Sequence, residues 1–367
     1  MSRSLTLAPV ELGVPEVISA AKKLADGHPV VLIDTTGSTD EGALLLAAET
    51  ITTEKMAFLV RYSSGFVCAA LPAEQADRLG LPAMSDQNQD RGQISFGVSV
   101  DASEGISTGI SAYDRARTAR LLADPATVPG DLRRPGHLVP VRTANAGVLA
   151  RSGLAEATAD LAALAGLAPV SVFASVVSEL YPTELAGADE LRTFAREHDL
   201  PVVELRQVKT HRLRTERQIG QEAEARLPLP AGNFTAVGFR SAIDGAEHLA
   251  LVEARTWTAA ATRPPSVYLH AECVIGDVFG SFGCPCGQRL QAAIEELGRR
   301  GNGLVLYLRT GQRGSTRLTE TLAGLAAGSA CPATLTPEQR SVAAEMLLDL
   351  GIEQTVSLGE VPLLLAR

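Results

Sequence analysis

The stretch HAECVIGDVFGSFGCPCGQRL, residues 270–290, is the most informative part of the chain because it gathers three of the five cysteines. Cys284 and Cys286 flank one proline, and Cys273 lies eleven positions earlier. Zinc accepts thiolate ligands, and three protein ligands leave a fourth position for water, as in catalytic zinc sites. We therefore predict that Cys273, Cys284 and Cys286 bind zinc. The alternative is a buried thiol with a chance pair in a glycine-rich turn.

The bulk composition indicates a globular protein of two domains. The chain has 367 residues, of which 46% are hydrophobic and 20% charged. A net charge of −9 argues against a nucleic-acid partner. The sequence has no apolar run of the length that a membrane span needs and no signal pattern at its start, and the clustered cysteines suit a reduced compartment. We therefore expect no membrane partner and a cytoplasmic location.

The first two hundred residues alternate helical and strand-like patterns. Apolar spacing predicts helices at 15–27, 41–51, 156–167 and 188–200. Buried or alternating patterns predict strands at 29–34, 65–71, 94–102, 170–177 and 201–205. This alternation is typical of an α/β domain.

A second domain follows a short polar segment. Residues 207–218, QVKTHRLRTERQ, are predicted to be a connector. Strand signals at 234–241, 248–255 and 266–272 come next, then a helix at 289–300 and a strand at 303–309. We therefore predict an α/β sandwich of the α+β type in residues 1–206, followed by a smaller α/β zinc domain in residues 219–367.

The segment from His270 to Gly287 resembles the zinc segment of GTP cyclohydrolase II, and RLPLPAGNFTAVGFRSAIDGAEHLALV (226–252) resembles that family's opening strands. The resemblance implies that the three cysteines are the zinc ligands and that His270 and Glu272 bind substrate. In such enzymes, water activated by zinc attacks the guanine ring of GTP. Formate and pyrophosphate are released.

The second domain departs from this family at its nucleotide-binding positions. Arg313 of the family's nucleotide loop is retained, but the sequence has no tyrosine after Tyr307 and no lysine after Lys209, where the family has both. The family's arginine nucleophile corresponds to Glu338, and Arg340 could replace it only after a shift of two residues. A triphosphate needs several cationic donors, so we expect ordinary GTP ring opening to be lost.

The first domain resembles 3,4-dihydroxy-2-butanone-4-phosphate synthase in VSVDASEGISTGISAYDRARTARLLADP (98–125), RRPGHLVPVR (133–142) and GVLARSGLAEATADLAALAG (147–166). This family releases formate from ribulose 5-phosphate at a magnesium site. Thr39 and Leu154 stand where the family has its two metal ligands, and Ser175 stands at a further glutamate. Magnesium needs hard donors, so we expect no magnesium and no synthase activity.

The residues on the phosphate side of the synthase resemblance are retained. The segment from Arg134 to His137 either binds a sugar phosphate or is retained because its turn organises the fold. We take His137, with Arg313 and Arg340, as the catalytic candidates. The candidates for substrate binding in this domain are Thr108, Ser111, Asp114, Arg115, Arg134 and His137.

Three functions are compatible with this sequence. The first is a paralogue that has lost both activities, a pseudoenzyme that binds or regulates an intact homologue, as a homodimer or in a mixed dimer. The second is a repurposed zinc hydrolase or lyase that acts on another nucleotide or sugar phosphate. The third is the ordinary bifunctional enzyme of riboflavin biosynthesis. We expect the first.

Overall fold

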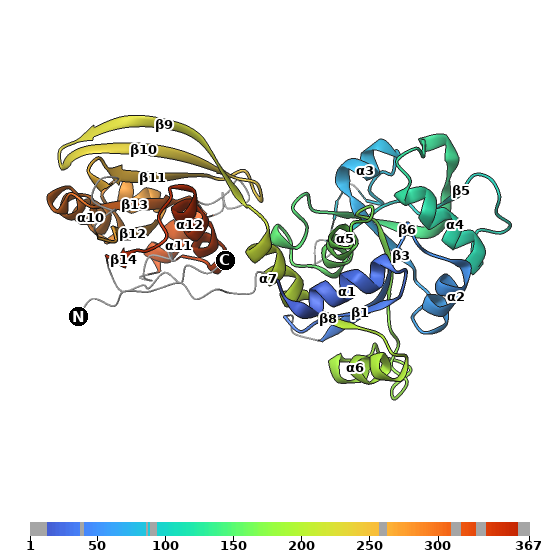
Figure 1. Cartoon of the computed structure of the whole chain (residues 1–367). Coiled ribbons are helices and arrows are strands. Elements are labelled where there is room, and N and C mark those ends of the chain that lie inside the picture. Colours follow the sequence, from blue (N-terminus) through green and yellow to red (C-terminus); the bar gives the residue numbers. More distant parts are fainter. Residues whose placement is uncertain are drawn as a thin grey trace. The chain divides into compact units, whose positions relative to one another are not determined.

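The computed structural model describes residues 13–36, 40–85, 87–88, 94–256, 263–309, 317–327 and 335–358. The chain divides into two compact units between Thr215 and Glu216 (Figure 1). Within the described ranges, no helix combines the length and the apolar character that a bilayer crossing requires. The two units are described separately.

The first unit is built on one mixed β-sheet. β1 (Val30–Asp34) pairs antiparallel with β2 (Glu41–Ala47) and parallel with β8 (Val202–Glu204), and β3 (Cys68–Pro72) pairs parallel with β6 (Leu132–Thr143). A further strand, β5 (Val100–Ala102), pairs with β6 away from the main path. The strand order is β4 (Ser95–Phe96), β6, β3, β7 (Ser171–Ser175), β2, β1, β8.

Helices cover both faces of this sheet. In β1, Val31 and Ile33 enter one apolar core, and Val30 and Leu32 enter another on the opposite face, because successive side chains of a strand alternate. The first core is closed by α2 (Thr53–Arg61), α3 (Ala73–Arg78), α4 (Ala112–Ala123) and α6 (Ala188–Glu197). The second is closed by α1 (Pro15–Ala25), α5 (Leu154–Leu164) and α7 (Leu205–Thr215).

Two of the expected elements differ in the structure. Residues 41–51, predicted as a helix, contain strand β2. Leu44 and Leu46 pack in one core while Leu45 and Ala47 pack in the other. A strand buried on both faces is apolar throughout, and its alanines and leucines imitate a helical segment. The strand expected at 94–102 is interrupted and forms the short β4 and β5.

The segment expected as a polar connector, 207–218, is helical through Thr215. Its helix α7 packs against the first unit through the buried residues Leu205 and Val208. The backbone N–H of Val14 donates a hydrogen bond to Nδ1 of His211, and Arg212 forms an ion pair with Asp160 at 2.7 Å. Leu205 and Val208 are three residues apart and together bury one side of an otherwise polar helix.

The second unit has a six-stranded sheet with helices packed on both faces. α10 (Cys286–Arg300) packs on one face and α12 (Pro337–Asp349) on the other. The short α9 (Val274–Asp277) and α11 (Arg317–Ala326) complete the described elements. The strand order is β14 (Val356–Ser357), β12 (Ser266–Ala271), β13 (Gly303–Leu308), β11 (Glu247–Glu253), β10 (Gly232–Ser241), β9 (Ile219–Leu229).

This topology places the cysteine stretch at the carboxyl ends of β12 and β13. β12 and β13 are parallel, and Ala271 pairs with Leu308 at their carboxyl ends. The chain after β12 therefore begins the 272–287 segment beside the end of β13. The predicted α/β architecture, a larger domain followed by a smaller one, is confirmed.

Candidate functional site

The three predicted metal ligands come together in the second unit. The Sγ atoms of Cys273, Cys284 and Cys286 lie within 4.8 Å of one another. Those of Cys273 and Cys284 are 3.5 Å apart. A tetrahedral zinc with Zn–S bonds of about 2.3 Å separates its sulfurs by roughly 3.8 Å, so the geometry fits zinc. Within the described residues, no other group of three His, Cys, Asp or Glu side chains is comparably close.

Two helix starts position these thiols. Cys273 caps α9, where its Sγ accepts a hydrogen bond from the N–H of Gly276 at 3.4 Å. Cys286 is the first residue of α10. The positive ends of helix dipoles favour anions, so both helix starts stabilise thiolates. A Cβ at Gly287 would lie 2.1 Å from the carbonyl oxygen of Gly276, so glycine is required at the close approach of the two turns.

Asp277 is the centre of a buried polar network beside the thiols. Its carboxylate lies 3.0 Å from Nε2 of His270, accepts the Tyr307 hydroxyl at 2.8 Å and accepts the backbone N–H of Cys273 at 2.8 Å. The rings of His270 and Tyr307 are stacked at 5.3 Å. Burial raises the pKa of Tyr307, and the hydrogen bond to Asp277 raises it further. Tyr307 therefore stays a neutral donor that fixes the carboxylate.

A second group of polar residues lies at the same end of the strands. Nε of Arg309 donates to Glu272 at 3.0 Å, and the backbone N–H of Arg309 donates to Nδ1 of His248 at 3.2 Å. Burial lowers the pKa of His248, so its ring is a neutral acceptor at neutral pH. Of the predicted substrate-binding residues, His270 is buried and tied to Asp277, whereas Glu272 is tied to Arg309.

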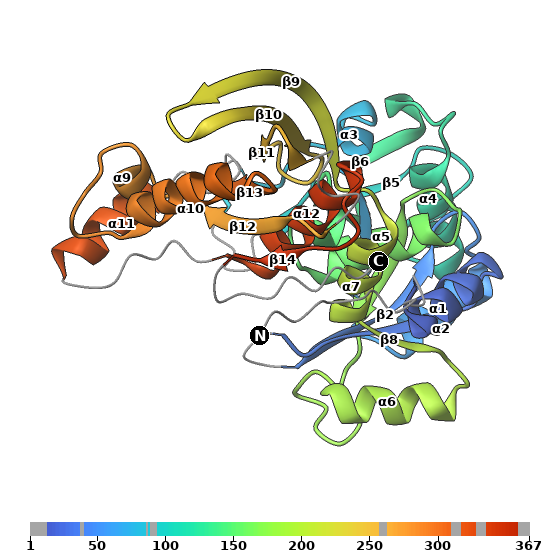
Figure 2. The same ribbon diagram turned by 60° about the vertical axis from the view of Figure 1, so that its left-hand side comes forward.

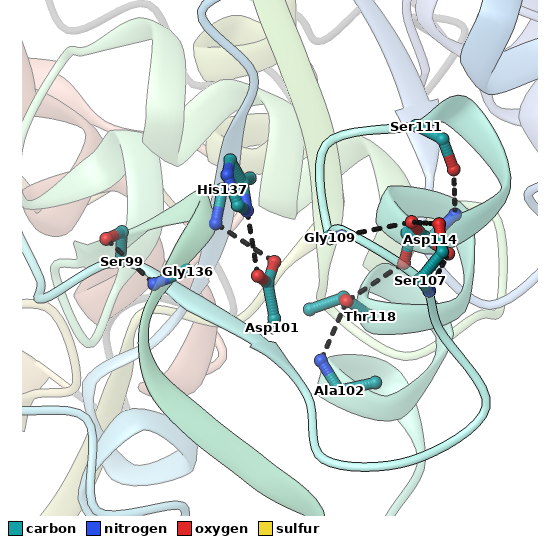
Figure 3. Close-up of polar contacts among 10 residues, drawn as sticks. All are labelled: Ser99, Asp101, Ala102, Ser107, Gly109, Ser111, Asp114, Thr118, Gly136 and His137. Atoms are coloured by element: carbon teal, nitrogen blue, oxygen red, sulfur yellow. Dashed lines mark hydrogen bonds and ion pairs between the residues drawn. The ribbon is translucent and has the colours of Figure 1, made fainter.

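The first unit contains a carboxylate–histidine pair. Nδ1 of His137 lies 2.8 Å from Oδ2 of Asp101, and the backbone N–H of His137 donates to Oδ1 at 2.9 Å (Figure 3). Asp101 is buried, whereas His137 is 38% exposed. Among the described residues, Nε2 of His137 has no partner. The carboxylate therefore orients a ring whose second nitrogen can exchange a proton with a ligand.

Asp114 organises the loop that precedes α4. It accepts hydrogen bonds from the backbone N–H and hydroxyl of Ser107, at 3.1 and 2.9 Å, and from the N–H of Gly109 at 3.0 Å (Figure 3). Burial opposes ionisation, but these bonds outweigh it and lower the pKa of Asp114. Ser111 caps the helix through its hydroxyl, and Thr108 is exposed between the anchored residues. A structural role explains Asp114 and Ser111.

The two predicted arginines of this unit bind carbonyl groups. Nη1 of Arg115 donates to the oxygen of Gly65 at 3.1 Å, and burial lowers the pKa of Arg115. Arg134 donates to the oxygens of Leu79 and Leu132, at 2.5 and 3.2 Å. Of the two predicted roles of the segment from Arg134 to His137, the contacts of Arg134 favour organisation of the fold, whereas His137 keeps a nitrogen for a ligand.

The described positions that stand at the synthase family's metal ligand and at its other carboxylates are neutral. Ala43 of β2 faces Ser175 of β7, so neither strand offers a carboxylate there. Leu154 begins α5 and packs against the apolar core. Glu156 is buried and paired with Arg151. Together these side chains do not provide the hard donors that magnesium needs. Thr39 lies outside the described residues, and the expected absence of magnesium stays a prediction.

For the remaining catalytic candidates, Arg313 and Arg340, no described contact with the thiols supports a catalytic role. Arg313 lies outside the described residues, and so does the side chain of Glu338. Arg340 is half-buried on α12, where its N–H donates to the oxygen of Thr336. The sequence interpretation missed Asp101, Asp277, Tyr307 and Arg309. Two of them carried a signal: Asp277 lies within the cysteine stretch, and Asp101 lies within the 98–125 segment that resembles the synthase.

Both units match known families. The model of 3,4-dihydroxy-2-butanone 4-phosphate synthase matches residues 18–211, and that of GTP cyclohydrolase II matches residues 220–362. Riboflavin biosynthesis protein RibBA of Nocardia farcinica is 46% identical over 290 residues, 79% of this chain and 69% of the relative. The protein of the same name from Salinispora arenicola is 45% identical over 304 residues, 83% and 70% of the two chains.

Solved structures of similar proteins agree with these family matches. RibBX of A. baumannii, described as a two-domain 3,4-dihydroxy-2-butanone 4-phosphate synthase, has a TM-score of 0.74, with 28% identity and coverage of 94% of each chain. A structure of the synthase in complex with two magnesium ions has a TM-score of 0.52 and 39% identity, over 56% of this chain and 98% of that one.

Fold and site together define a protein with a synthase domain and a cyclohydrolase domain. The chain belongs to the RibBA family of bifunctional riboflavin biosynthesis proteins. The expected resemblance is confirmed at the level of the family. The expected loss of both activities is not confirmed, because no feature of the structure tests it and identities near 45% favour the ordinary activities.

Proposed function

We propose that this chain acts in riboflavin biosynthesis and that its second unit is a zinc-dependent hydrolase that opens the guanine ring of GTP. The observation that carries the proposal is the fixed cluster of Cys273, Cys284 and Cys286. Zinc at these thiolates would act as a Lewis acid and activate water for attack. The family match over residues 220–362 and the identity to RibBA proteins support GTP as the substrate.

The surrounding residues hold the thiols in place and supply polar groups. Asp277 fixes the backbone of Cys273 and the rings of His270 and Tyr307, so one buried carboxylate ties a ligand loop to the ends of two strands. Partners of this kind fix the orientation of metal ligands. Glu272 is half-buried, is paired with Arg309 and directly precedes Cys273, so we expect it to contact a substrate bound at the thiol cluster.

The test is to incubate zinc-replete protein with GTP and to follow formate, pyrophosphate and the pyrimidine absorbance separately. We expect all three products, and their loss in the Cys284→Ser, Cys286→Ser double variant. Zinc-loaded protein that releases no formate contradicts the proposal. Release of pyrophosphate alone would show a phosphate reaction without ring opening.

A second candidate function is supported by the first unit. Ala43 facing Ser175, and Leu154 at the start of α5, favour a unit that binds a ligand or an intact homologue without catalysis. The similarity to RibBA proteins favours ordinary synthase activity instead. Mixing the chain with an intact homologue and measuring the homologue's rate and the mass of the complex tests the regulatory role, and an unchanged rate with no complex rejects it.

A further inference from the structure

The strand β9 leaves an edge of the second unit's sheet open. It is the last strand in the order, and among the described residues it pairs with β10 alone (Figures 1 and 2). All side chains from residue 221 to residue 228 are exposed, on both faces of the strand. An open edge with both faces in water is a template for pairing with another strand.

The side chains of β9 form two different faces. The register with β10 is regular from Ala223 to Leu229, so side chains alternate. One face carries Ala223, Ala225 and Leu227, beside the buried Phe234 that faces Leu227 across the ladder. This face continues the apolar side of the sheet, where α10 packs.

The opposite face carries two charged side chains that have no ion-pair partner among the described residues. Glu222 pairs with Arg240 at 2.6 Å. In the part of the chain that the structure describes, neither Glu224 nor Arg226 has an ion-pair partner. Two opposite charges two positions apart on an edge strand can be satisfied by the same two charges on a strand that runs the other way.

We propose that β9 pairs antiparallel with β9 of a second copy of this chain, with Ala225 facing Ala225 across the two-fold axis. This register places Glu224 opposite Arg226 twice and Ala223 opposite Leu227 twice. A register centred on Ala223 would instead place Glu222 opposite Glu224. A register centred on Glu224 or on Arg226 would place that residue opposite its own copy, so like charges would face each other. Isologous contacts of this kind are the commonest in homo-oligomers.

Pro228 sets the length of the ladder. Proline has no N–H to donate, so the continuous pairing covers residues 223–227 of each copy. The interface joins two second units and is independent of the proposed hydrolase reaction and of any dimer formed by the first unit.

The register is tested by a cysteine on the proposed axis, in zinc-loaded full-length protein. Facing residues of antiparallel strands have Cα atoms about 4.5 to 5.5 Å apart, within disulfide range. We expect Ala225→Cys to form a covalent dimer under mild oxidation, seen on a non-reducing gel beside the unsubstituted protein. The matched control is Ala223→Cys, the same substitution on the same face, because two residues at 223 would lie about 14 Å apart in this register.

A charge exchange tests the pairing itself. In the Ala225→Cys background, Glu224→Arg should reduce the cross-linking yield about tenfold, since it sets arginines against each other at two places. Adding Arg226→Glu should restore the yield. The proposal is overturned if Ala225→Cys gives no more dimer than the unsubstituted protein, if Ala223→Cys cross-links instead, or if the double exchange yields no more dimer than the single change. Protein that stays monomeric while an added extended peptide binds β9 also overturns it.

Discussion

The Tyr307 hydroxyl donates a hydrogen bond of 2.8 Å to Oδ2 of Asp277, the same oxygen that accepts the backbone N–H of Cys273. This relationship connects a tyrosine on β13 to the loop that carries the first thiol. Because Asp277 is buried, loss of either donor weakens the hydrogen bonding that stabilises its carboxylate.

We predict that Tyr307→Phe weakens zinc binding. Removing the hydroxyl costs about 1.5 to 3 kcal/mol of hydrogen bonding to a charged group, and loss of such outer partners typically lowers metal affinity roughly 10- to 100-fold. Competition with a chromophoric chelator measures the affinity. Tyr268→Phe is the control, because among the described residues the Tyr268 hydroxyl has no hydrogen bond. Equal affinities of the two variants would contradict the role given to Asp277.

We predict about one zinc per chain, lost in the Cys284→Ser, Cys286→Ser double variant. Three thiolates prefer zinc to the oxygen-seeking cations. Elemental analysis after dialysis measures the stoichiometry. Cys68→Ser serves as the control, since Cys68 is buried in β3 of the first unit and is not part of the thiol cluster. Burial raises its pKa to about 12. A stoichiometry near zero, or one that the double variant leaves unchanged, would reject the site.

The local patterns of the sequence predicted most strands and the helices α1, α5, α6 and α10. They did not predict the central strand β2, the long strand β6 or the helices α2, α3, α4 and α7. In β2, the residues from Ala43 to Ala47 are buried on both faces, and a fully apolar run has no period that separates strand from helix. Tertiary burial therefore decided its conformation. The amphipathic helix α10 and the hairpin strand β10 have one apolar face each, and their patterns were sufficient.

The site was predictable where its residues are close in sequence. The three cysteines lie within one short segment, and their spacing by itself indicates a metal site. Asp277 and Tyr307 are 30 positions apart, and Asp101 and His137 are 36 apart. No pattern of spacing predicts such pairs, because the sheet register brings them together. The contacts of Arg134 with carbonyl oxygens depend on the fold in the same way.

We predict that the second unit loses stability as the pH falls below neutral, in part through His248. Burial lowers the pKa of His248 below its ordinary 6.5. Its contribution to stability is therefore complete above pH 6.5 and declines as the pH falls from 6.5 through the lowered folded pKa, because the unfolded state then binds more protons. Urea unfolding of the second unit at about pH 7.5 and about pH 5.5, on either side of that value, measures the difference.

The variant His248→Asn should reduce this pH dependence, since an amide oxygen can accept the N–H of Arg309 without titrating. His28→Asn is the control, because His28 is exposed and lies in the first unit. An unchanged difference between the two pH values in His248→Asn would show that His248 is not the titrating group.

Finally, we predict that the first unit releases no formate from ribulose 5-phosphate with magnesium. By resemblance, Thr39 and Leu154 stand at the two metal ligands, and the facing pair of Ala43 and Ser175 adds no carboxylate. Magnesium binds poorly without several hard donors. Manganese, read by electron paramagnetic resonance, reports binding directly. The double variant Thr39→Glu, Leu154→His should gain metal binding and traces of activity, whereas each single variant should not, because one ligand holds magnesium weakly. Magnesium-dependent formate release by the unsubstituted chain would show instead that this unit assembles its metal site from other donors, and would make the chain an ordinary synthase.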